Sequence, residues 1–275
     1  MIPVLQYNAV EELSIHPQLL HLVVQQSAAF TGMLLADEDQ KQIVYWQVTE
    51  HGPEESIAAM EAAFQKLPIP AEAIPRTTVI SFALDAALLP PMIASAKDVA
   101  DNLLELTQGR TEAGQSVLLA PGTVPVVFRW QAAVHDALRQ RLPAHASWQH
   151  ILGLLWRQQV TDASAITITI LLQQFVLCVE HAGKRLLLQQ YAYQAPEDIL
   201  YRVLQAVQAL QLDAEQVVVT LQGLVAPESA TVQLLQQYLA QVQWGQMQHY
   251  TCANNKHMPN PATLALADIL LTCAS

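Results

Sequence analysis

The stretch Lys184-Arg-Leu-Leu-Leu-Gln-Gln190, followed by Pro196-Glu-Asp-Ile-Leu200, decides the fold, because the chain contains this pattern twice. An earlier copy runs from Lys41-Gln-Ile-Val-Tyr-Trp-Gln47 to Pro53-Glu-Glu-Ser-Ile57, and lysine and proline are twelve residues apart in both copies. A conserved order of such segments along one chain indicates a repeated structural unit. We therefore interpret the protein as an internal duplication.

The match extends to both sides of this stretch. Upstream and downstream segments recur in the same order, and we pair Leu22–Gln26 with Ile170–Gln174, Phe30 with Phe175, Thr78–Phe82 with Val217–Leu221, and Ser95 with Ser229. Short apolar runs separated by turn residues predict three antiparallel strands at the start of each copy. Pro53 and Pro196, each followed by two carboxylates, predict helix starts, because proline suits the first helical position and acids suit the positive end of the helix dipole.

Each copy is thus predicted to be βββαβα. The apolar stripe of Ile199, Val203 and Val207 packs the first helix on the sheet, and Ser95 and Ser229 begin the last helix. The first copy continues through strands near 117–119 and 124–130 and a helix with Val134 and Leu138, and the second ends through 246–252 and a proline-containing tail.

This order matches the ribonuclease-H-like plan, with an N-terminal lobe at 1–145 and a C-terminal lobe at 146–275. Two such α/β lobes in one chain predict an actin-like arrangement with a cleft between them.

Composition excludes several classes of function. The 275 residues include 24 acidic and 13 basic side chains, for a net charge of −11, which disfavours binding to nucleic acid. The apolar runs fall far short of the roughly 18 to 20 residues that span a bilayer, so we expect no membrane span. Three scattered cysteines, Cys178, Cys252 and Cys273, favour a reducing, cytoplasmic location.

The chain resembles a family of uncharacterised Bacteroidetes proteins, a domain of unknown function whose structural kin have the actin-like ATPase fold. The resemblance covers nearly the whole chain and is carried by Lys184–Tyr201, Gln211–Leu224 and Leu234–Val242. The family is also distantly similar to actin-fold components of pilus assembly and secretion machines, which hold partners together. It supplies no catalytic residue to carry over.

The resemblance implies two strand-turn-strand loops that hold Mg-phosphate in an actin-like ATPase. Each loop needs an aspartate, which orients the metal's water shell, and small residues that let backbone N–H groups approach the phosphates. The corresponding stretches, Leu19–Phe30 and Ala165–Val179, contain no Asp, Glu or Gly. The adenosine-side loop, usually two glycines after a strand, keeps only Gly223, which we interpret as a strand-to-loop turn.

Other candidate sites have ordinary structural explanations. His249, Cys252 and His257 could form a small metal site, although structural zinc needs a fourth ligand. Cys178 could act as a nucleophile with His181, but it falls within an apolar strand. Gly183-Lys184 and the acids at 37–39 are interpreted as turns, and the tryptophans 130, 148, 156 and 244 as core or binding-surface residues.

The sequence leaves three hypotheses open. The leading one is a non-catalytic scaffold on a degenerate actin-like fold that binds a protein partner, with no enzyme activity, catalytic residue or cofactor assigned. The alternative is a divergent ATP-binding protein with little or no hydrolysis, whose metal ligand is Asp162 or Asp85. The third is metal binding at His249, Cys252 and His257.

Overall fold

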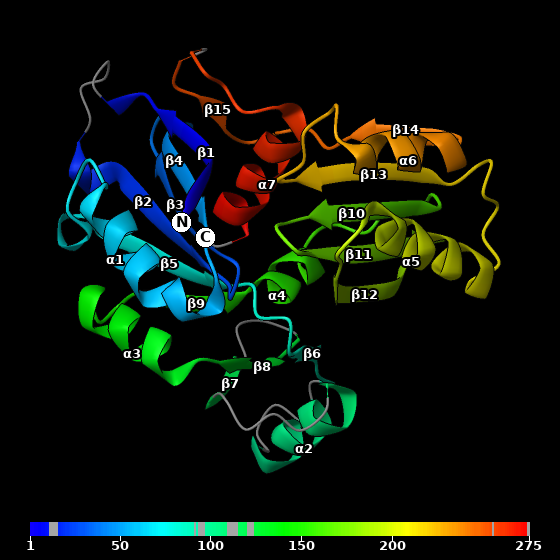
Figure 1. Cartoon of the computed structure of the whole chain (residues 1–275), viewed down its shortest axis with the longest axis horizontal. Coiled ribbons are helices and arrows are strands. Elements are labelled where there is room, and N and C mark those ends of the chain that lie inside the picture. Colours follow the sequence, from blue (N-terminus) through cyan, green and yellow to red (C-terminus); the bar gives the residue numbers. More distant parts are fainter. Residues whose placement is uncertain are drawn as a thin grey trace. The chain divides into compact units, whose positions relative to one another are not determined.

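The computed structural model describes residues 1–10, 16–90, 92, 97–108, 115–119, 124–254 and 256–273. Contacts divide the chain into two compact units (Figure 1). Unit 1 comprises Met1–Trp156, His249–Met258 and Leu270–Ser275, and unit 2 comprises Arg157–Gln248 and Pro259–Ile269. The chain therefore enters unit 2 twice, at Arg157 and at Pro259, and returns to unit 1 after each passage.

Unit 1 contains a seven-stranded sheet in the order β1-β4-β3-β2-β5-β9, with β15 also pairing with β4. Its strands are β1 (Ile2–Asn8), β2 (Leu20–Gln26), β3 (Phe30–Asp37), β4 (Gln42–Glu50), β5 (Arg76–Ser81), β9 (Ser147–His150) and β15 (Thr251–Cys252). β2, β3 and β4 are antiparallel neighbours, whereas β5 and β9 are parallel additions. β2 and β3 are buried along their whole length, and they therefore bury polar side chains such as His21 and Gln25 together with their apolar ones.

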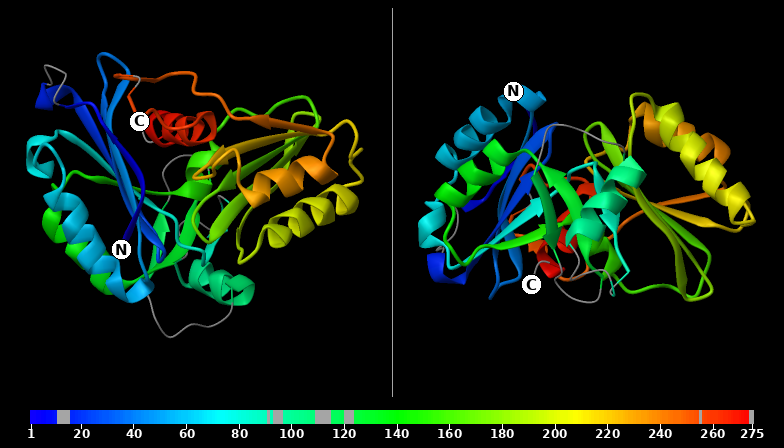
Figure 2. Two further views of the ribbon diagram at one scale, coloured as in Figure 1. Left: turned by 45° about the horizontal axis from the view of Figure 1, so that its top comes forward. Right: turned by 90° about the horizontal axis from the view of Figure 1, so that it is seen from below.

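Three helices follow the strands of this sheet: α1 (Ser56–Gln65), α3 (Ala132–Arg141) and α4 (Ile151–Trp156). Helix α1 packs on β3 and against α3, and Figure 2 shows α1 and α3 side by side. Pro53 starts a short 3-10 turn, Pro53–Glu55, that leads into α1, and the carboxylate of Glu55 accepts a hydrogen bond from the Gly52 amide at 3.1 Å. The predicted helix start at Pro53 is confirmed.

An insertion separates β5 from α3 in unit 1. It contains β6 (Ala86–Leu88), α2 (Lys97–Gln108), β7 (Gln115–Leu119) and β8 (Val126–Trp130), and its strands form a separate sheet in the order β6-β8-β7. A small core holds it together, made of Leu89, Ala100, Leu104 and Val127. The strands predicted near 117–119 and 124–130 are therefore present.

Unit 2 contains a five-stranded sheet in the order β12-β11-β10-β13-β14. Its strands are β10 (Ala165–Ile170), β11 (Gln174–His181), β12 (Lys184–Ala192), β13 (Val218–Gly223) and β14 (Gln241–Trp244), and its helices are α5 (Pro196–Ala209) and α6 (Ala230–Tyr238); α7 (Pro261–Thr272) begins in this unit. The predicted apolar stripe on α5 lies in the core with Ile199, Val203 and Val207. Ser229 caps α6 by accepting a hydrogen bond from the Val232 amide at 3.4 Å.

The duplication is real in topology, but its register differs from the one predicted. Gln26 ends β2 opposite Ser81, just as Ile170 ends β10 opposite Gly223. Gln25-Gln26 therefore belongs to a strand, whereas Gln173-Gln174 belongs to a turn and the next strand. The downstream pairing of Thr78 with Val217 is likewise shifted by three positions. Gln-rich apolar runs match each other in several registers, and only the strand ladder selects one.

In both units the shared plan continues with one further strand after βββαβα. The last strands, β9 and β14, pair in parallel with β5 and β13, and the helices before them, α3 and α6, are the corresponding pair. The predicted match between the helices after Ser95 and Ser229 is therefore wrong, and Ser95 itself lies outside the described residues. The insertion from β6 to β8 places α2 between β5 and α3, so the sequence comparison matched α6 with α2 and not with α3.

The first unit extends past the predicted boundary at residue 145, because β9 pairs with β5 and α4 follows directly from β9. The predicted tail of the second copy contains β15, which joins the sheet of unit 1, and the helix α7. No described helix has the length and apolar character needed to cross a bilayer.

Candidate functional site

The turn between β2 and β3 corresponds to the first predicted phosphate loop. The hydroxyl oxygen of Ser27 accepts hydrogen bonds from the backbone N–H groups of Ala29 and Phe30, both at 2.9 Å. Ser27 is 7% exposed. Backbone N–H groups at such a turn are the donors that would bind a phosphate. Here the chain satisfies two of them with its own side chain.

A network of polar side chains lies beside this turn. Thr31 Oγ1 lies 2.9 Å from both Gln26 Oε1 and His51 Nε2, and Gln26 Nε2 donates to the Ser27 carbonyl at 2.9 Å. Gln26, Thr31 and His51 are all buried. Amide and hydroxyl groups occupy the place where an ATPase needs a carboxylate, so this turn lacks an anchor for a magnesium ion.

The turn between β10 and β11 corresponds to the second predicted loop and is also closed by protein groups. The Tyr193 hydroxyl donates to the Leu171 carbonyl at 3.0 Å, and the Tyr193 amide donates to the Gln173 carbonyl at 3.1 Å. Gln190 Nε2 donates to Gln174 Oε1 at 3.0 Å nearby. Gln173 has a φ of 59°, which is a strained value for a residue with a side chain. The second turn is likewise uncharged.

Gly223 lies at the end of β13, beside this second turn. Its φ is 113°, and a Cβ atom placed on it would lie 1.9 Å from the Ile170 carbonyl oxygen. The Leu224 amide donates to that same oxygen at 2.7 Å, and the Thr263 hydroxyl donates to the Gly223 carbonyl at 3.0 Å. Glycine is therefore required by close contact with the neighbouring strand, which agrees with its interpretation as a turn residue.

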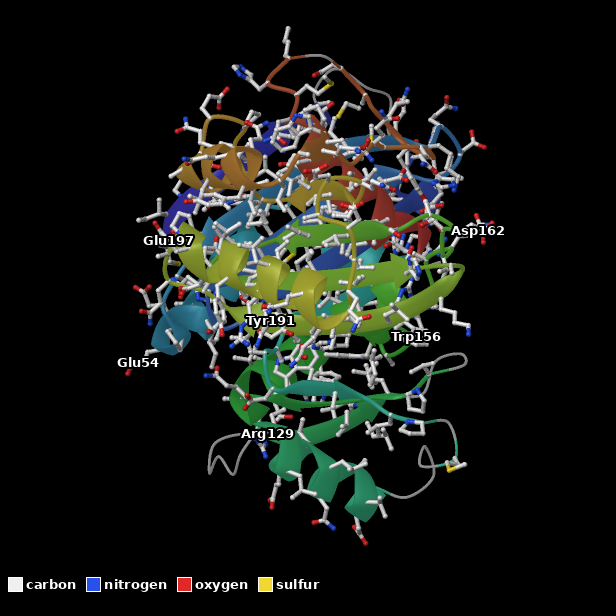
Figure 3. The ribbon with its side chains drawn as sticks, turned by 90° about the vertical axis from the view of Figure 1, so that its right-hand side faces the viewer. Glu54, Arg129, Trp156, Asp162, Tyr191 and Glu197 are labelled. Atoms are coloured by element: carbon white, nitrogen blue, oxygen red, sulfur yellow. The ribbon has the colours of Figure 1, made fainter. Side chains whose placement is uncertain are left out.

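The two carboxylates considered as alternative metal ligands lie elsewhere in their units, and Figure 3 labels one of them, Asp162. Asp162 precedes β10 and approaches Gly183 in the β11–β12 turn, whereas the candidate loop follows the other end of β10, roughly 20 Å along the strand. Asp85 pairs with Arg129, whose Nη1 lies 3.4 Å from Asp85 Oδ2. The residues at the two turns therefore do not fit Mg-phosphate, and these acids do not supply what is missing.

The most extensive charged cluster surrounds Glu38, at the opposite end of β2. The carboxylate of Glu38 accepts hydrogen bonds from Lys41 Nζ at 2.7 Å and the Tyr250 hydroxyl at 2.9 Å, and it lies 3.1 Å from His21 Nδ1. His21 is buried, and burial lowers its pKa. Tyr250 belongs to the segment that returns to unit 1, so the cluster anchors that segment. The sequence showed only a small acidic turn here.

The Glu38 cluster predicts acid sensitivity. Burial raises the pKa of Glu38, but hydrogen bonds from His21, Lys41 and Tyr250 outweigh it and lower the pKa from 4.5 to about 2. The ionised carboxylate thus stabilises the fold above its unfolded pKa, and this contribution is lost as pH falls from about 4.5 towards 2.

We expect the difference in unfolding free energy between the wild type and Glu38→Gln to shrink by about 2 kcal/mol over that range, because the carboxylate is partly exposed and screened. Urea unfolding at several pH values measures it. The same comparison for Asp39→Gln, an exposed acid in the same turn, serves as the control. A constant wild type to Glu38→Gln difference would contradict the assigned role of Glu38.

The residues of the metal hypothesis, which the sequence analysis left as its third alternative, do not gather into a site. Cys252 lies in β15 beside β4, where burial raises the pKa of its thiol to about 11. Among the described residues, no group of three or more His, Cys, Asp and Glu side chains is placed to hold a metal ion. His249, Cys252 and His257 therefore lack the convergence that the metal hypothesis requires.

Cys178 has the properties of a buried structural thiol. Burial raises its pKa to about 11, and its sulfur lies 3.8 Å from Glu180 Oε1. His181, the proposed base, instead has its Nδ1 2.7 Å from the Ser164 hydroxyl. A nucleophilic cysteine needs a low pKa and a nearby base, and this one has neither arrangement.

Of the four candidate tryptophans, Trp130 is buried, whereas the other three, at positions 148, 156 and 244, are partly exposed. Trp130 packs edge-on against Trp148 with ring centroids 5.4 Å apart, and Trp148 also lies under Arg139. Trp244 packs on the core of unit 2. The interpretation as core packing thus holds for Trp130, while Trp148 and Trp244 pack against other residues but stay partly exposed.

Comparison with known proteins places this geometry in a family. The model of the family described as "Protein of unknown function (DUF3822)" matches residues 13–242. The chain belongs to this family. The family description names no activity, so it assigns no role to the candidate turns. No curated protein matches the chain.

Solved structures establish the fold of this DUF3822 protein. A Bacteroides thetaiotaomicron protein with actin-like ATPase fold and unknown function matches with a TM-score of 0.72 at 12% identity, over 93% of this chain and 96% of that chain. A chain of the PilM–PilN type IV pilus biogenesis complex matches with a TM-score of 0.52 at 12% identity, over 93% and 98%.

The ethanolamine utilization protein EutJ from Carboxydothermus hydrogenoformans matches with a TM-score of 0.51 at 9% identity, over 96% and 93%. The chain thus has the actin-like ATPase fold, built from two ribonuclease-H-like lobes. The resemblance seen in the sequence is confirmed, as is the predicted α/β fold class.

Proposed function

We propose that this DUF3822 protein is a non-catalytic scaffold in the cytoplasm that binds a protein partner through an actin-like fold without ATP hydrolysis. One observation carries the proposal: Ser27 occupies two backbone N–H groups at the first candidate phosphate turn. At the second turn the Leu171 amide donates to the Gln174 carbonyl at 2.8 Å, and the Tyr193 hydroxyl donates to the Leu171 carbonyl at 3.0 Å. Both turns also lack carboxylates that could hold the metal.

The similarity to a chain of the PilM–PilN complex supports the scaffold part of this proposal. That structure, as its name states, is a complex of two proteins in pilus biogenesis. At 12% identity the likeness supports the fold, and a partner for this chain remains a proposal. Binding of ATP without hydrolysis is the alternative, and the closed turns count against it.

Thermal unfolding with millimolar Mg-ATP and Mg-ADP tests the proposal. A ligand that binds the folded chain adds RT ln(1 + [L]/Kd) to its stability, about 4 kcal/mol at a thousand times Kd. We expect no change in Tm with either nucleotide relative to Mg-tripolyphosphate, which controls for anion effects. A rise of several degrees with Mg-ATP alone would favour the alternative.

A further inference from the structure

The two units differ at one strand edge, although they share a topology. In unit 1, β1 covers the outer side of β4 as an antiparallel strand, from Ile2 opposite Glu50 to Asn8 opposite Tyr45. In unit 2, whose residues are all described, the corresponding strand β12 pairs with β11 and has no strand on its outer side. An uncovered strand edge is a template for another strand.

β4 and β12 occupy the same place in the repeat. Each is the second strand of a hairpin, each carries a single register shift near the turn, and each leads to a helix that starts at a proline. The last pair before the shift is Leu35 with Tyr45 in unit 1 and Val179 with Leu187 in unit 2. Tyr45–Glu50, which β1 covers, therefore corresponds to Leu187–Ala192.

The backbone of β12 is oriented to accept a strand along this stretch. The Tyr193 amide donates to Gln173 on the β11 side. Backbone groups alternate in direction along an antiparallel strand, so the amides of Leu188 and Ala192 point to the outer side. The exposed side chains here include Leu186, which is 42% exposed.

We propose that β12 binds an extended segment of a partner protein as an added antiparallel strand. This inference rests on the proposed scaffold function, and it identifies the outer edge of β12 as the place where the partner binds. The added strand takes the direction that β1 takes on β4, so its first residues lie beside Ala192 and its last beside Leu187, and it runs towards Lys184.

The charges around β12 define the chemistry of this partner. Lys184 is exposed at the start of the strand, and Arg202 on α5 is exposed beside its end, with its guanidinium 5.0 Å from the Tyr191 ring centroid. The apolar run 186–188 lies between these two charges. The complementary segment is therefore apolar in its centre and acidic at both ends.

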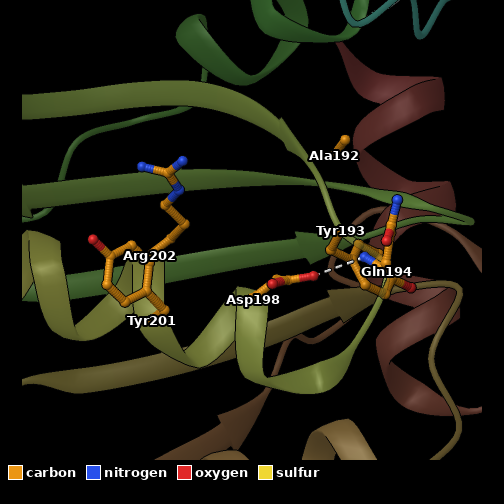
Figure 4. A pocket seen from close by; sticks show the side chains of 6 residues that line it. All are labelled: Ala192, Tyr193, Gln194, Asp198, Tyr201 and Arg202. Carbon is orange, nitrogen blue, oxygen red and sulfur yellow. Dashed lines mark hydrogen bonds between the residues drawn. The ribbon is translucent and has the colours of Figure 1, made fainter.

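An open pocket of about 440 Å³ lies where the first side chain of the added strand would be (Figure 4). It is lined by Ala192, Tyr193, Gln194, Asp198, Tyr201 and Arg202. The Asp198 carboxylate accepts hydrogen bonds from the Gln194 and Ala195 amides at 2.9 and 3.0 Å, which lower its pKa. The Asp198 carboxylate is thus already hydrogen-bonded to two backbone amides. Arg202 is the charged group of the pocket that can pair with an acidic side chain.

Fluorescence anisotropy with a defined peptide tests this edge. The probe is a fluorescein-labelled peptide with the Ile2–Asn8 sequence, which already pairs with the corresponding strand, flanked by one glutamate at each end. We expect saturable binding to the full chain. Leu188→Pro removes one outer-side amide without touching the β11 ladder, and it should weaken binding about tenfold. Leu188→Ala, which keeps the amide, is its matched control.

A charge swap tests the same edge independently of proline. Lys184→Glu with Arg202→Glu should weaken binding of the glutamate-flanked peptide and strengthen that of a lysine-flanked one. Circular dichroism verifies that each variant is folded. Absence of saturable binding, or equal binding by Leu188→Pro and Leu188→Ala, would overturn the proposal.

A concentration-dependent dimer of the wild type that Leu188→Pro abolishes would also overturn it, because a second copy would then occupy the edge. Nucleotide binding is a separate readout. Binding of Mg-ATP would contradict the proposed scaffold function but would not change the anisotropy result. A peptide that does not bind would contradict only the proposed binding site on β12.

Discussion

Replacing Gly223 with alanine is expected to destabilise unit 2 by about 4 kcal/mol or more, or to prevent its folding. The new Cβ atom would lie 1.9 Å from the Ile170 carbonyl oxygen, and the positive φ of 113° is unfavourable for any residue with a side chain. The neighbouring strand cannot move away without opening the 2.7 Å hydrogen bond from Leu224 to the same oxygen. Urea unfolding followed by circular dichroism measures the loss.

Gly52→Ala is the matched control for this substitution. A Cβ atom at position 52 would meet only Glu55 Oε2, at 3.9 Å, and the φ of −77° suits alanine. We expect a change of about 1 kcal/mol or less there. If Gly223→Ala unfolds at the same urea concentration as Gly52→Ala, the close contact between β13 and β10 is not as described.

Arg185→Met is expected to cost about 3 kcal/mol, because it leaves a buried carboxylate without its partner. Arg185 Nη2 and Nε donate to Glu180 Oε1 at 2.6 and 3.0 Å, and the two side chains are 4% and 11% exposed. Arg185 Nη2 also donates to the Gln158 carbonyl at 3.1 Å, and Glu180 Oε2 accepts from the Thr161 amide at 3.1 Å. The pair therefore fixes the segment before β10 to the hairpin.

A second substitution distinguishes the cost of the unpaired Glu180 carboxylate from the cost of the other contacts that Arg185 loses. Glu180→Gln added to Arg185→Met removes the charge and should recover part of the lost stability, which a double-mutant cycle measures. Arg202→Met, at an exposed arginine on α5, should change stability by less than about 0.5 kcal/mol. Equal costs for Arg185→Met and Arg202→Met would refute a buried ion pair.

Local signals in the sequence were sufficient for many elements. Pro53 and Pro196, each with carboxylates in the next two positions, marked two helix starts, because capping and dipole effects act within one turn. Ala182-Gly183 closes the β11–β12 hairpin with φ values of 50° and 70°, as expected for a tight turn between two apolar runs. These features depend on neighbours in the chain.

The errors arose where partners are distant in sequence. The register of the repeat was misjudged because glutamine-rich strands match in several frames, and only pairing such as Gln26 with Ser81 fixes one. The β6–β8 insertion hid the correspondence of α3 and α6. Helix α7 was missed, although Asn260 accepts a hydrogen bond from the Thr263 amide and Pro261 follows it, which is a recognisable helix start.

At the candidate site, too, the sequence predicted local features but not the contacts between residues. The sequence established that both turns lack acidic residues, but it did not reveal that Ser27 caps the Ala29 and Phe30 amides. A serine at the first position of a turn predicts such bonds only weakly. The Glu38 cluster was also hidden, because Tyr250 reaches it from the far end of the chain.

We infer that the chain's own side chains occupy polar backbone groups at the two turns that the sequence analysis predicted as phosphate loops. Calorimetric titration of Mg-ATP into the full chain tests it most directly, because heat reports binding whether or not hydrolysis follows. We expect no heat of binding, so that the titration shows only the heat of dilution. Saturable, one-to-one binding with a micromolar dissociation constant would contradict it.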